Sequence, residues 1–244
     1  MSVRTRHGRY GFDAPWSLVG LFLGAIALLA LAVISFVLAV AAAGVAFTFG
    51  GLYTLASAFS HLYTTRRGKF AVWDEELRRL RGDERVLDLG CGRGAVLLAA
   101  AKRLTDGGRA TGVDLWRAKG RTGDTRAARA NAEAEGVADR VDLVTGDLRD
   151  LPFRDDGFDV VLSGQALHDI PSAEGRVRAV REAYRVLRPG GLMLLADVQH
   201  TPDYEETLRD LGVIDVRRRD AGWRYWYGGP WSATAIVEAR KPTG

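Results

Sequence analysis

The longest unbroken pattern in the chain is an apolar one near its beginning. No charged residue occurs between Ala14 and Ser60, and Leu, Val, Ile and Ala dominate this run. A helix that crosses a bilayer needs about 20 apolar residues, so the run is too long for one span and too short for three. We therefore predict a transmembrane hairpin within residues 16–63, with helices at about 17–38 and 42–62.

No Pro, Asn or Asp marks the turn of this hairpin, and we place it within residues 39–44. One long tilted span followed by a re-entrant piece fits the same length. A secretory signal is shorter and ends at a cleavage site, and a buried soluble helix is seldom apolar over such a length.

Basic residues flank the apolar run on both sides, which predicts its orientation. Because Lys and Arg stay on the cytoplasmic side of a membrane, both ends of the hairpin are expected there. Trp16 and Tyr63 are then expected at the same membrane interface. The chain thus divides into a basic cytoplasmic N-terminus (1–15), the hairpin (16–63) and a cytoplasmic domain (64–244), joined by a short link at 64–69. The basic residues are Arg4, Arg6 and Arg9 before the run, and Arg66, Arg67 and Lys69 after it.

Beyond the apolar run, short β-type segments alternate with helical ones. This alternation predicts an α/β domain with a Rossmann-like, doubly wound and mostly parallel sheet of seven strands. Strands are predicted from residue 86, and at 112–116, 141–144, 158–163, 192–196, 213–218 and 233–239; helices are predicted at 73–80, 95–104, 122–135, 173–187 and 204–211.

The first of these strands runs directly into a glycine-rich turn, Gly90-Cys91-Gly92-Arg93-Gly94. Such a strand–turn–helix handles nucleotides, and the glycines let a ligand lie against bare main chain. Asp88 opposes a pyrophosphate at this point but suits an ammonium or sulfonium group, as in S-adenosylmethionine. The spacing also satisfies the loose dinucleotide fingerprint, so a nicotinamide-dependent oxidoreductase stays open. A second interpretation of Asp88 is a cap on the following helix.

Two further acids end predicted strands. Asp114 lies roughly 20 residues beyond the glycines, where an acid accepts hydrogen bonds from ribose hydroxyls. Asp147 is placed to accept a bond from an adenine amino group, with Leu148 packing on the ring. A turn role without a ligand fits both acids as well.

Four stretches in order resemble one family: VLDLGCGRG (86–94), GVDLW (112–116), residues 146–170 and VLRPGGLMLLAD (186–197). Residues 69–241 resemble class I S-adenosylmethionine-dependent methyltransferases, and are similar to the methyltransferase type 11 group. The resemblance implies an antiparallel last strand at 233–239, and a cofactor lid at 69–73 for which a plain linker fits nearly as well. It also implies that the methionine end of the cofactor lies on Asp88 and the glycines, the ribose at Asp114 and the adenine at Asp147 and Leu148. The implied cofactor-binding residues are Asp88, Gly90, Gly92, Gly94, Asp114, Leu115, Asp147, Leu148 and Gln165.

Catalysis in such a fold is mainly placement of an acceptor against the methyl group. His168 follows the fourth predicted strand and is the best candidate base, although packing or capping explains it equally simply. Asp169 is interpreted as a turn residue, and Cys91 as a small packing residue. The aromatic cluster at 223–231 fits an acceptor-pocket wall, a headgroup contact or a loop packed on its own sheet.

Composition narrows the function classes. The chain has 244 residues and a formal net charge of +4, and its basic residues are interspersed with acids. That distribution suits an anionic membrane surface and is not a nucleic-acid footprint; no metal is expected. The sequence therefore predicts a methyltransferase anchored in the cell membrane and acting on a small-molecule or lipid-like acceptor. A non-catalytic membrane module that binds the cofactor is a further alternative, and neither acceptor nor oligomeric state is indicated.

Overall fold

The computed structural model describes residues 6–105, 107–116 and 125–243, which form two compact units. The first, which we call the sheet unit, combines the start of the chain up to Tyr10 with Phe70–Ala221 and the chain from Thr234 onward. The second, the hairpin unit, combines Gly11–Lys69 with Gly222–Ala233. The sequence did not indicate that residues 222–233 group with the apolar helices.

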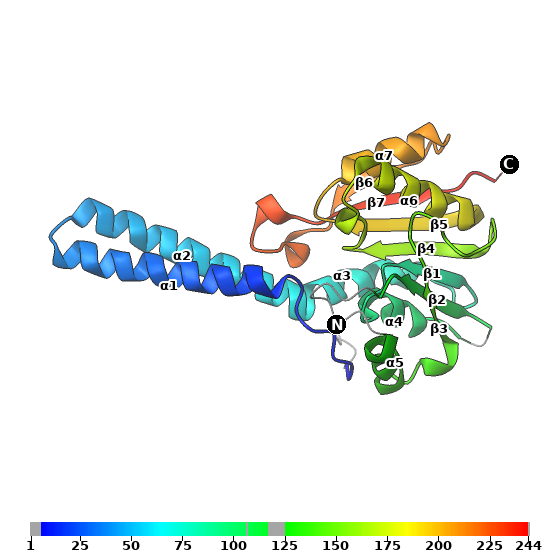
Figure 1. Cartoon of the computed structure of the whole chain (residues 1–244), viewed down its shortest axis with the longest axis horizontal. Coiled ribbons are helices and arrows are strands. Elements are labelled where there is room, and N and C mark those ends of the chain that lie inside the picture. The colour runs from blue at the N-terminus through cyan, green and yellow to red at the C-terminus, as the bar shows by residue number, and fades with distance from the viewer. Residues whose placement is uncertain (1–5, 106, 117–124, 244) are drawn as a thin grey trace. The chain divides into compact units, whose positions relative to one another are not determined.

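A seven-stranded sheet organises the first unit (Figure 1), as predicted. Its strand order is β3-β2-β1-β4-β5-β7-β6. Neighbouring strands from β3 to β5 are parallel, and β7 is antiparallel to both β5 and β6. The strands are β1 (Arg85–Leu89), β2 (Arg109–Asp114), β3 (Val141–Thr145), β4 (Phe158–Gly164), β5 (Leu187–Asp197), β6 (Arg217–Asp220) and β7 (Ala235–Arg240).

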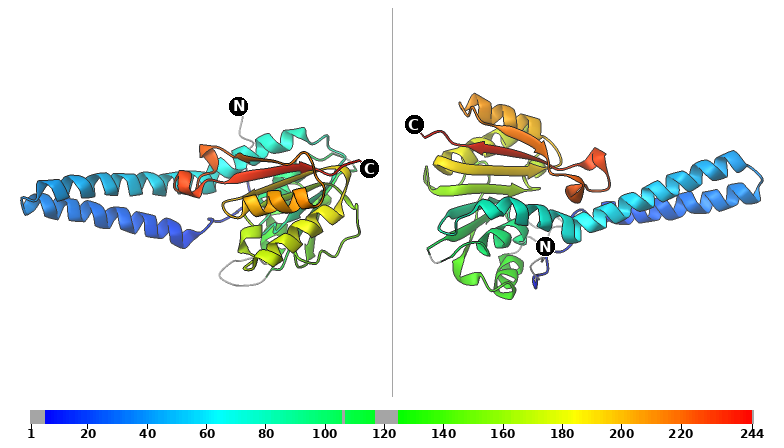
Figure 2. Two further views of the ribbon diagram at one scale, coloured as in Figure 1. Left: turned by 90° about the horizontal axis from the view of Figure 1, so that it is seen from above. Right: turned by 180° about the vertical axis from the view of Figure 1, so that it is seen from behind.

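Helices cover both faces of this sheet. The order runs outward from β1 in two directions, so right-handed crossovers place the helices of the two halves on opposite faces. In Figures 1 and 2, α6 and α7 lie on one face, and α3, α4 and α5 lie on the other. Their bounds are α3 (Lys69–Glu76), α4 (Ala95–Ala101), α5 (Thr125–Ala134), α6 (Ala173–Val186) and α7 (Thr201–Asp210).

Several predicted boundaries were wrong by a few residues. Strand β5 begins at Leu187 rather than 192, because the Pro189-Gly190-Gly191 stretch stays in the sheet: Gly190 donates its N–H to the carbonyl of Lys241. Strand β6 begins at Arg217, later than the predicted 213. Strand β2 starts at Arg109 and ends at Asp114. The predicted start of α5 at residue 122 lies outside the described residues.

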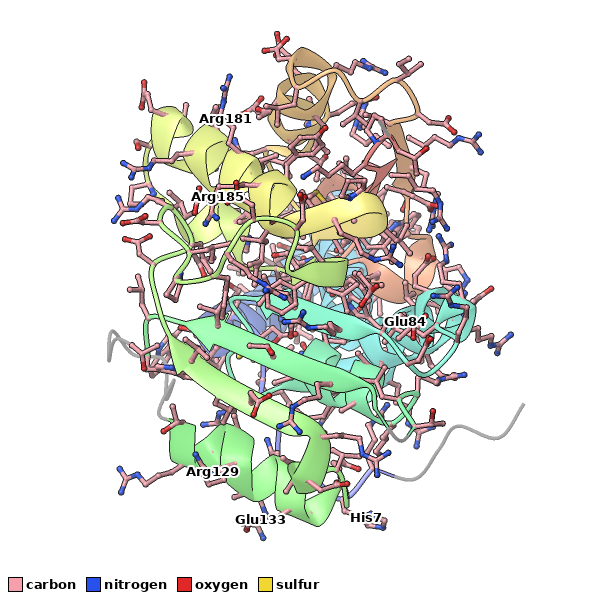
Figure 3. The ribbon with its side chains drawn as sticks, turned by 90° about the vertical axis from the view of Figure 1, so that its right-hand side faces the viewer. His7, Glu84, Arg129, Glu133, Arg181 and Arg185 are labelled. Atoms are coloured by element: carbon pink, nitrogen blue, oxygen red, sulfur yellow. The ribbon has the colours of Figure 1, made fainter. Side chains whose placement is uncertain are left out.

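The core of the sheet unit is built from the apolar faces of the strands. Leu87, Leu89, Val161 and Met193 are fully buried in one cluster, as expected of parallel strands covered on both faces. The outer helices are amphipathic: Figure 3 shows Arg129 and Glu133 of α5 pointing away from the sheet. This arrangement holds the carboxyl ends of β1, β2 and β4 at one edge, where ligands bind in open α/β sheets.

The hairpin unit contains α1 (Pro15–Val37) and α2 (Ala41–Tyr63), packed side by side as a helical hairpin. The turn lies at residues 38–40; the prediction of a turn within 39–44 was wrong for residues 41–44, which form the start of α2. Both helices are long and apolar enough to cross a membrane, by length and composition. The predicted short link at 64–69 is not a loop: a π-helical turn, Thr64–Gly68, carries α2 directly into α3.

The two helices of the hairpin meet mostly through small side chains. Buried residues recur every seven positions, at Leu18, Ala25 and Ala32 in α1 and at Gly44, Gly51 and Ala58 in α2; Ser57 and His61 of α2 are buried as well. At Gly51, an added Cβ would lie 2.7 Å from the side chain of Leu29. The large apolar side chains point outward instead; Leu23, Ile26 and Phe49 are all more than half exposed. This is the reverse of a water-soluble helix pair, whose apolar face is turned inward.

Candidate functional site

The glycine-rich turn lies where β1 ends. Gly90, Gly92 and Gly94 have φ values of +68°, +51° and +85°, in the left-handed region that favours glycine. A Cβ at Gly90 would lie 2.3 Å from the Cβ of Ala166, so this glycine also permits the turn to pack on the end of β4. At Gly92 the nearest atom to an added Cβ is 4.0 Å away, so that position faces open space.

Asp88 is the most unusual side chain at this edge. It is 1% exposed, and neither carboxylate oxygen makes a hydrogen bond of normal geometry within the described residues. Burial raises the pKa of Asp88 well above its usual value; the nearby Leu97 amide opposes this shift and the charge of Asp114 adds to it. The N-cap of α4 is Gly94, so Asp88 does not occupy the capping position. A buried carboxylate in this state is suited to a cationic ligand.

Asp114 holds the turn from the end of β2. One oxygen accepts a hydrogen bond from the Gly92 N–H at 3.0 Å, and the other accepts from the Trp116 N–H at 3.0 Å. Each carboxylate oxygen keeps further acceptor capacity. The structure thus brings together Asp88, the glycines and Asp114, as the sequence predicted.

The predicted adenine residues lie at the end of the next strand. Gly146 donates its N–H to the carbonyl of Asp114 at 3.1 Å. Asp147 is therefore held close to the end of β2, where Asp114 is predicted to bind the ribose. The carboxylate of Asp147 accepts bonds from Arg149, the shortest at 2.6 Å, and lines a hollow of about 470 Å³. Leu148 is buried in the core cluster, whereas Leu115 is only half-buried.

The remaining residues of the predicted site make contacts with other residues of the chain. Gln165 has a left-handed backbone, and its Nε2 donates to the Thr234 hydroxyl at 2.8 Å. Residues 69–73 form the start of α3; Trp73 there is fully buried beside Gly164, at the end of β4. Cys91 is buried, and burial raises the pKa of its thiol.

His168 forms a close pair with an acid that sequence reasoning missed. Its Nδ1 lies 2.6 Å from Oδ1 of Asp197, the buried last residue of β5. The other oxygen of Asp197 accepts from the His168 N–H at 3.0 Å and from the Tyr204 hydroxyl at 3.3 Å. Nε2 of His168 lies 3.6 Å from the half-exposed Asp169. The signal for Asp197 was present in the sequence, because it is an acid that ends an apolar strand, as Asp114 is.

The segment before the hairpin reaches the glycine turn through Asn131 of α5. The Asn131 side chain accepts from the Arg9 N–H at 2.7 Å and donates to the carbonyl of Arg93 at 2.9 Å. Glu135 accepts from the Gly8 N–H at 2.9 Å and from the Tyr10 hydroxyl at 2.8 Å. Residues 7–10 are thus packed on α5 and the residue that follows it, which nothing in the sequence indicated.

The sheet order and the glycine turn are similar to those of class I S-adenosylmethionine-dependent methyltransferases. Residues 87–195 match a family described as "Methyltransferase domain", so this region of the chain is similar to S-adenosylmethionine-dependent methyltransferases. The site fits the cofactor on two observations: a buried carboxylate without a normal hydrogen bond, and a turn with open space at Gly92.

Named relatives agree with this class. The chain is 36% identical over 125 residues to 27-O-demethylrifamycin SV methyltransferase of Amycolatopsis mediterranei, covering 50% of this chain and 42% of that protein. It is 34% identical over 137 residues to a ubiquinone/menaquinone biosynthesis C-methyltransferase of Ruegeria sp., covering 56% and 51%. The chain spans about half the length of the curated relatives it matches.

A similar solved structure is the [4+2]-cyclase SpnF, with a TM-score of 0.58 and 25% identity, covering 72% of this chain and 81% of that one. Because this neighbour is a cyclase, likeness in fold does not by itself fix the reaction.

Proposed function

We propose that the chain is a membrane-anchored methyltransferase that transfers a methyl group from S-adenosylmethionine to a small or lipid-like acceptor on the cytoplasmic side. The observation that carries the proposal is the buried Asp88 carboxylate beside three left-handed glycines. S-adenosylmethionine supplies a methyl group on a positively charged sulfur when it is bound.

In this proposal, the residues of the turn bind and orient the cofactor. Asp88 places a negative charge beside its methionine end, where the ligand carries an ammonium group. Gly92 leaves the main chain bare, and Asp114 accepts hydrogen bonds from the ribose. Asp147 and Leu148 bind the adenine, and Leu115 and Gln165 complete the contact.

His168 is proposed as the general base. Nδ1 of His168 lies 2.6 Å from Asp197, although not in normal hydrogen-bond geometry, and this negative charge favours the tautomer with the proton on Nδ1. Nε2 is then the nitrogen that takes the proton of the acceptor. Asp197 is itself fixed by donors from Val198 and Tyr204, so it acts as a positioning residue. A base of this kind serves an acceptor that must lose a proton from a hydroxyl group, such as an alcohol or a phenol.

The membrane anchor is supported by the surface of the hairpin. Each helix has 23 residues, or about 34 Å, against a hydrocarbon core of about 30 Å. Small residues face inward and large apolar ones outward, which suits lipid and not water. Basic residues at both ends favour two spans with the enzyme domain in the cytoplasm. A lipid-like acceptor accords with such an anchor, and one relative is named for quinone biosynthesis.

The first experiment is calorimetry of S-adenosylmethionine binding to the detergent-solubilised chain. We expect a loss of affinity in Asp88→Ala and Asp114→Ala; unchanged affinity in both would refute the site. Binding of a nicotinamide cofactor instead would support the oxidoreductase alternative.

The second experiment measures transfer of labelled methyl to fractionated membrane and cytosol extracts. Asp197→Asn is expected to lower the rate by about 10²- to 10⁴-fold with cofactor affinity unchanged. Asp169→Asn, a change of the same kind on the other side of His168, is the control and should keep most of the rate. Cofactor binding without transfer to any fraction would favour the non-catalytic module.

A further inference from the structure

The loop at residues 222–233 is built into the hairpin unit, although it connects strands β6 and β7 of the sheet. It carries three tryptophans and two tyrosines within ten residues. Such a density of amphipathic rings on a helical hairpin calls for a physical explanation, because both Trp223 and Trp231 stay about 60% exposed.

Main-chain contacts hold this loop against α2. The carbonyl of Trp226 accepts hydrogen bonds from the hydroxyls of Thr64 at 2.7 Å and Ser60 at 3.3 Å. Gly68 permits the approach, because a Cβ there would lie 1.8 Å from the carbonyl oxygen of Arg224. Within the loop, Tyr227 donates its N–H to the carbonyl of Ser232. These bonds satisfy backbone groups without water, which is the condition for irregular chain at membrane depth.

A polar cluster fixes the loop at the base of the hairpin. Asp13 accepts from Lys69 Nζ at 2.6 Å and from the Tyr227 hydroxyl at 2.8 Å. The main-chain oxygen of Asp13 lies 3.0 Å from Nε2 of the buried His61. The entry to α1, the end of α2 and the loop are therefore joined by one set of bonds, and the charges face inward.

The outward rings lie at two levels along α2. Trp223 stacks on Tyr63, with ring centroids 5.3 Å apart, and Trp231 contacts Tyr53 at 5.4 Å. Tyr53 and Tyr63 are ten residues apart, which corresponds to about 15 Å of helix. Trp16 stands in the first turn of α1, at the same end of the hairpin as Tyr63.

The surface between these two levels is apolar. Val19, Leu23 and Phe59 are exposed there, while the polar Ser57 and His61 of the same stretch are buried. Beyond Tyr53 the exposed surface continues as large apolar side chains to the turn. Trp and Tyr collect where hydrocarbon meets the headgroups, and that boundary lies at Trp16 and Tyr63 on this surface.

We propose that loop 222–233 is a membrane-embedded collar on the hairpin. Trp223, with Tyr63 and Trp16, lies at the headgroup level of the leaflet that the hairpin enters. Trp231, with Tyr53, lies deeper, among the acyl chains of the same leaflet. This inference rests on the proposed membrane anchor, and its partner is a phospholipid bilayer.

The test is tryptophan quenching in the full chain reconstituted in phospholipid vesicles. The quenchers are phospholipids brominated either near the headgroup or deep in the acyl chain. Trp223→Phe should reduce quenching by the shallow lipid to the part that Trp16 contributes, and Trp231→Phe should remove quenching by the deep one. Trp73→Phe is the matched control, because Trp73 is fully buried in the sheet unit and should contribute nothing to either signal. Cofactor binding by each variant verifies that it is folded.

The outcomes separate this inference from the anchor. If each of the two variants lost shallow and deep quenching equally, the proposed difference in depth between Trp223 and Trp231 would be wrong, because the loop would then lie flat on the surface. A vesicle-bound chain whose Trp16 is quenched by lipid while Trp223 and Trp231 are not would overturn the collar and leave the anchor standing. A chain that does not stay with the vesicles would overturn both.

Discussion

Replacing Asp88 by Asn tests the site most directly, because it is expected to change stability and binding in opposite directions. The pKa of Asp88 is raised in the folded protein by burial, so the folded state holds its proton more tightly than the unfolded chain does. Stability is therefore lost as the pH rises from the usual aspartate range through the raised value, and the loss is complete above it. Asn has the same shape and carries no charge, so Asp88→Asn removes this loss.

The size of both effects follows from the burial of this carboxylate. Leaving a buried polar group without partners costs about 1–3 kcal/mol, and more when it is charged. We expect Asp88→Asn to stabilise the ligand-free protein by about 1–3 kcal/mol at pH 8, a rise in melting temperature of roughly 2–10 °C. A hydrogen bond to a charged group contributes about 1.5–3 kcal/mol, so cofactor affinity should fall about 10- to 150-fold.

The assays are thermal unfolding in detergent from pH 4 to pH 8, and calorimetry with S-adenosylmethionine. The stability gain should shrink toward the acid end, because Asp88 is protonated there in the folded state and is increasingly protonated in the unfolded chain. In the unchanged protein, cofactor affinity should rise with pH, because a bound cation favours the ionised carboxylate. Asp142→Asn is the control: Asp142 is paired with Arg109 and has a lowered pKa, so this change should cost a little stability and leave binding alone. A variant at residue 88 that melts no higher at pH 8, or binds as tightly as before, would falsify this account of the site.

Three further predictions use matched pairs of substitutions. Gly90→Ala should abolish folding or cofactor binding, because its Cβ meets Ala166; Gly92→Ala, with open space around it, should fold at a cost of about 1–2 kcal/mol yet bind the cofactor more weakly, as calorimetry would show. Asn131→Ala should lose about 1–3 kcal/mol in thermal unfolding and weaken cofactor binding through Arg93, whereas Glu133→Ala on the outer face of α5 should do neither. Gly51→Leu should separate the helices of the hairpin and expose them to protease in detergent, whereas Gly20→Leu, with no atom within 4 Å of the added Cβ, should be tolerated; equal protection of the two would contradict the small-residue seam.

Much of the sheet unit was predictable, because each signal is local. A glycine turn after an apolar strand and an acid at each strand end are properties of a few adjacent residues, and they located Asp88, Asp114 and the strands that they follow. Boundaries were less accurate where tertiary contacts decide them. Strand β5 extends back over Pro189-Gly190-Gly191 because the main chain beyond β7 pairs with it, and no local pattern reports that pairing.

The missed parts of the site come from distant segments. Asn131 joins residues 9 and 93, and its surroundings in the sequence are an ordinary amphipathic helix. Asp197 ends an apolar strand, as Asp114 does, yet no role was predicted for it from the sequence. The pairing with His168 depends on β4 and β5 being neighbours, which is a property of the sheet.

The hairpin shows what hydropathy alone leaves out. The length of the apolar run located both helices within two residues, but it does not indicate which side chains face inward. The spacing does: buried residues, all Ala or Gly except Leu18, recur every seven positions in each helix, the repeat of a close-packed helix pair. In water this arrangement of side chains would be unfavourable, because the larger apolar side chains would remain exposed while Ala and Gly were buried. Packing of small residues gains little from water exclusion, so we expect this pairing to be most stable where the outward Leu, Ile and Phe have apolar neighbours of their own. The order of side chains within the hairpin, more than its length, is therefore the physical argument for the proposed anchor.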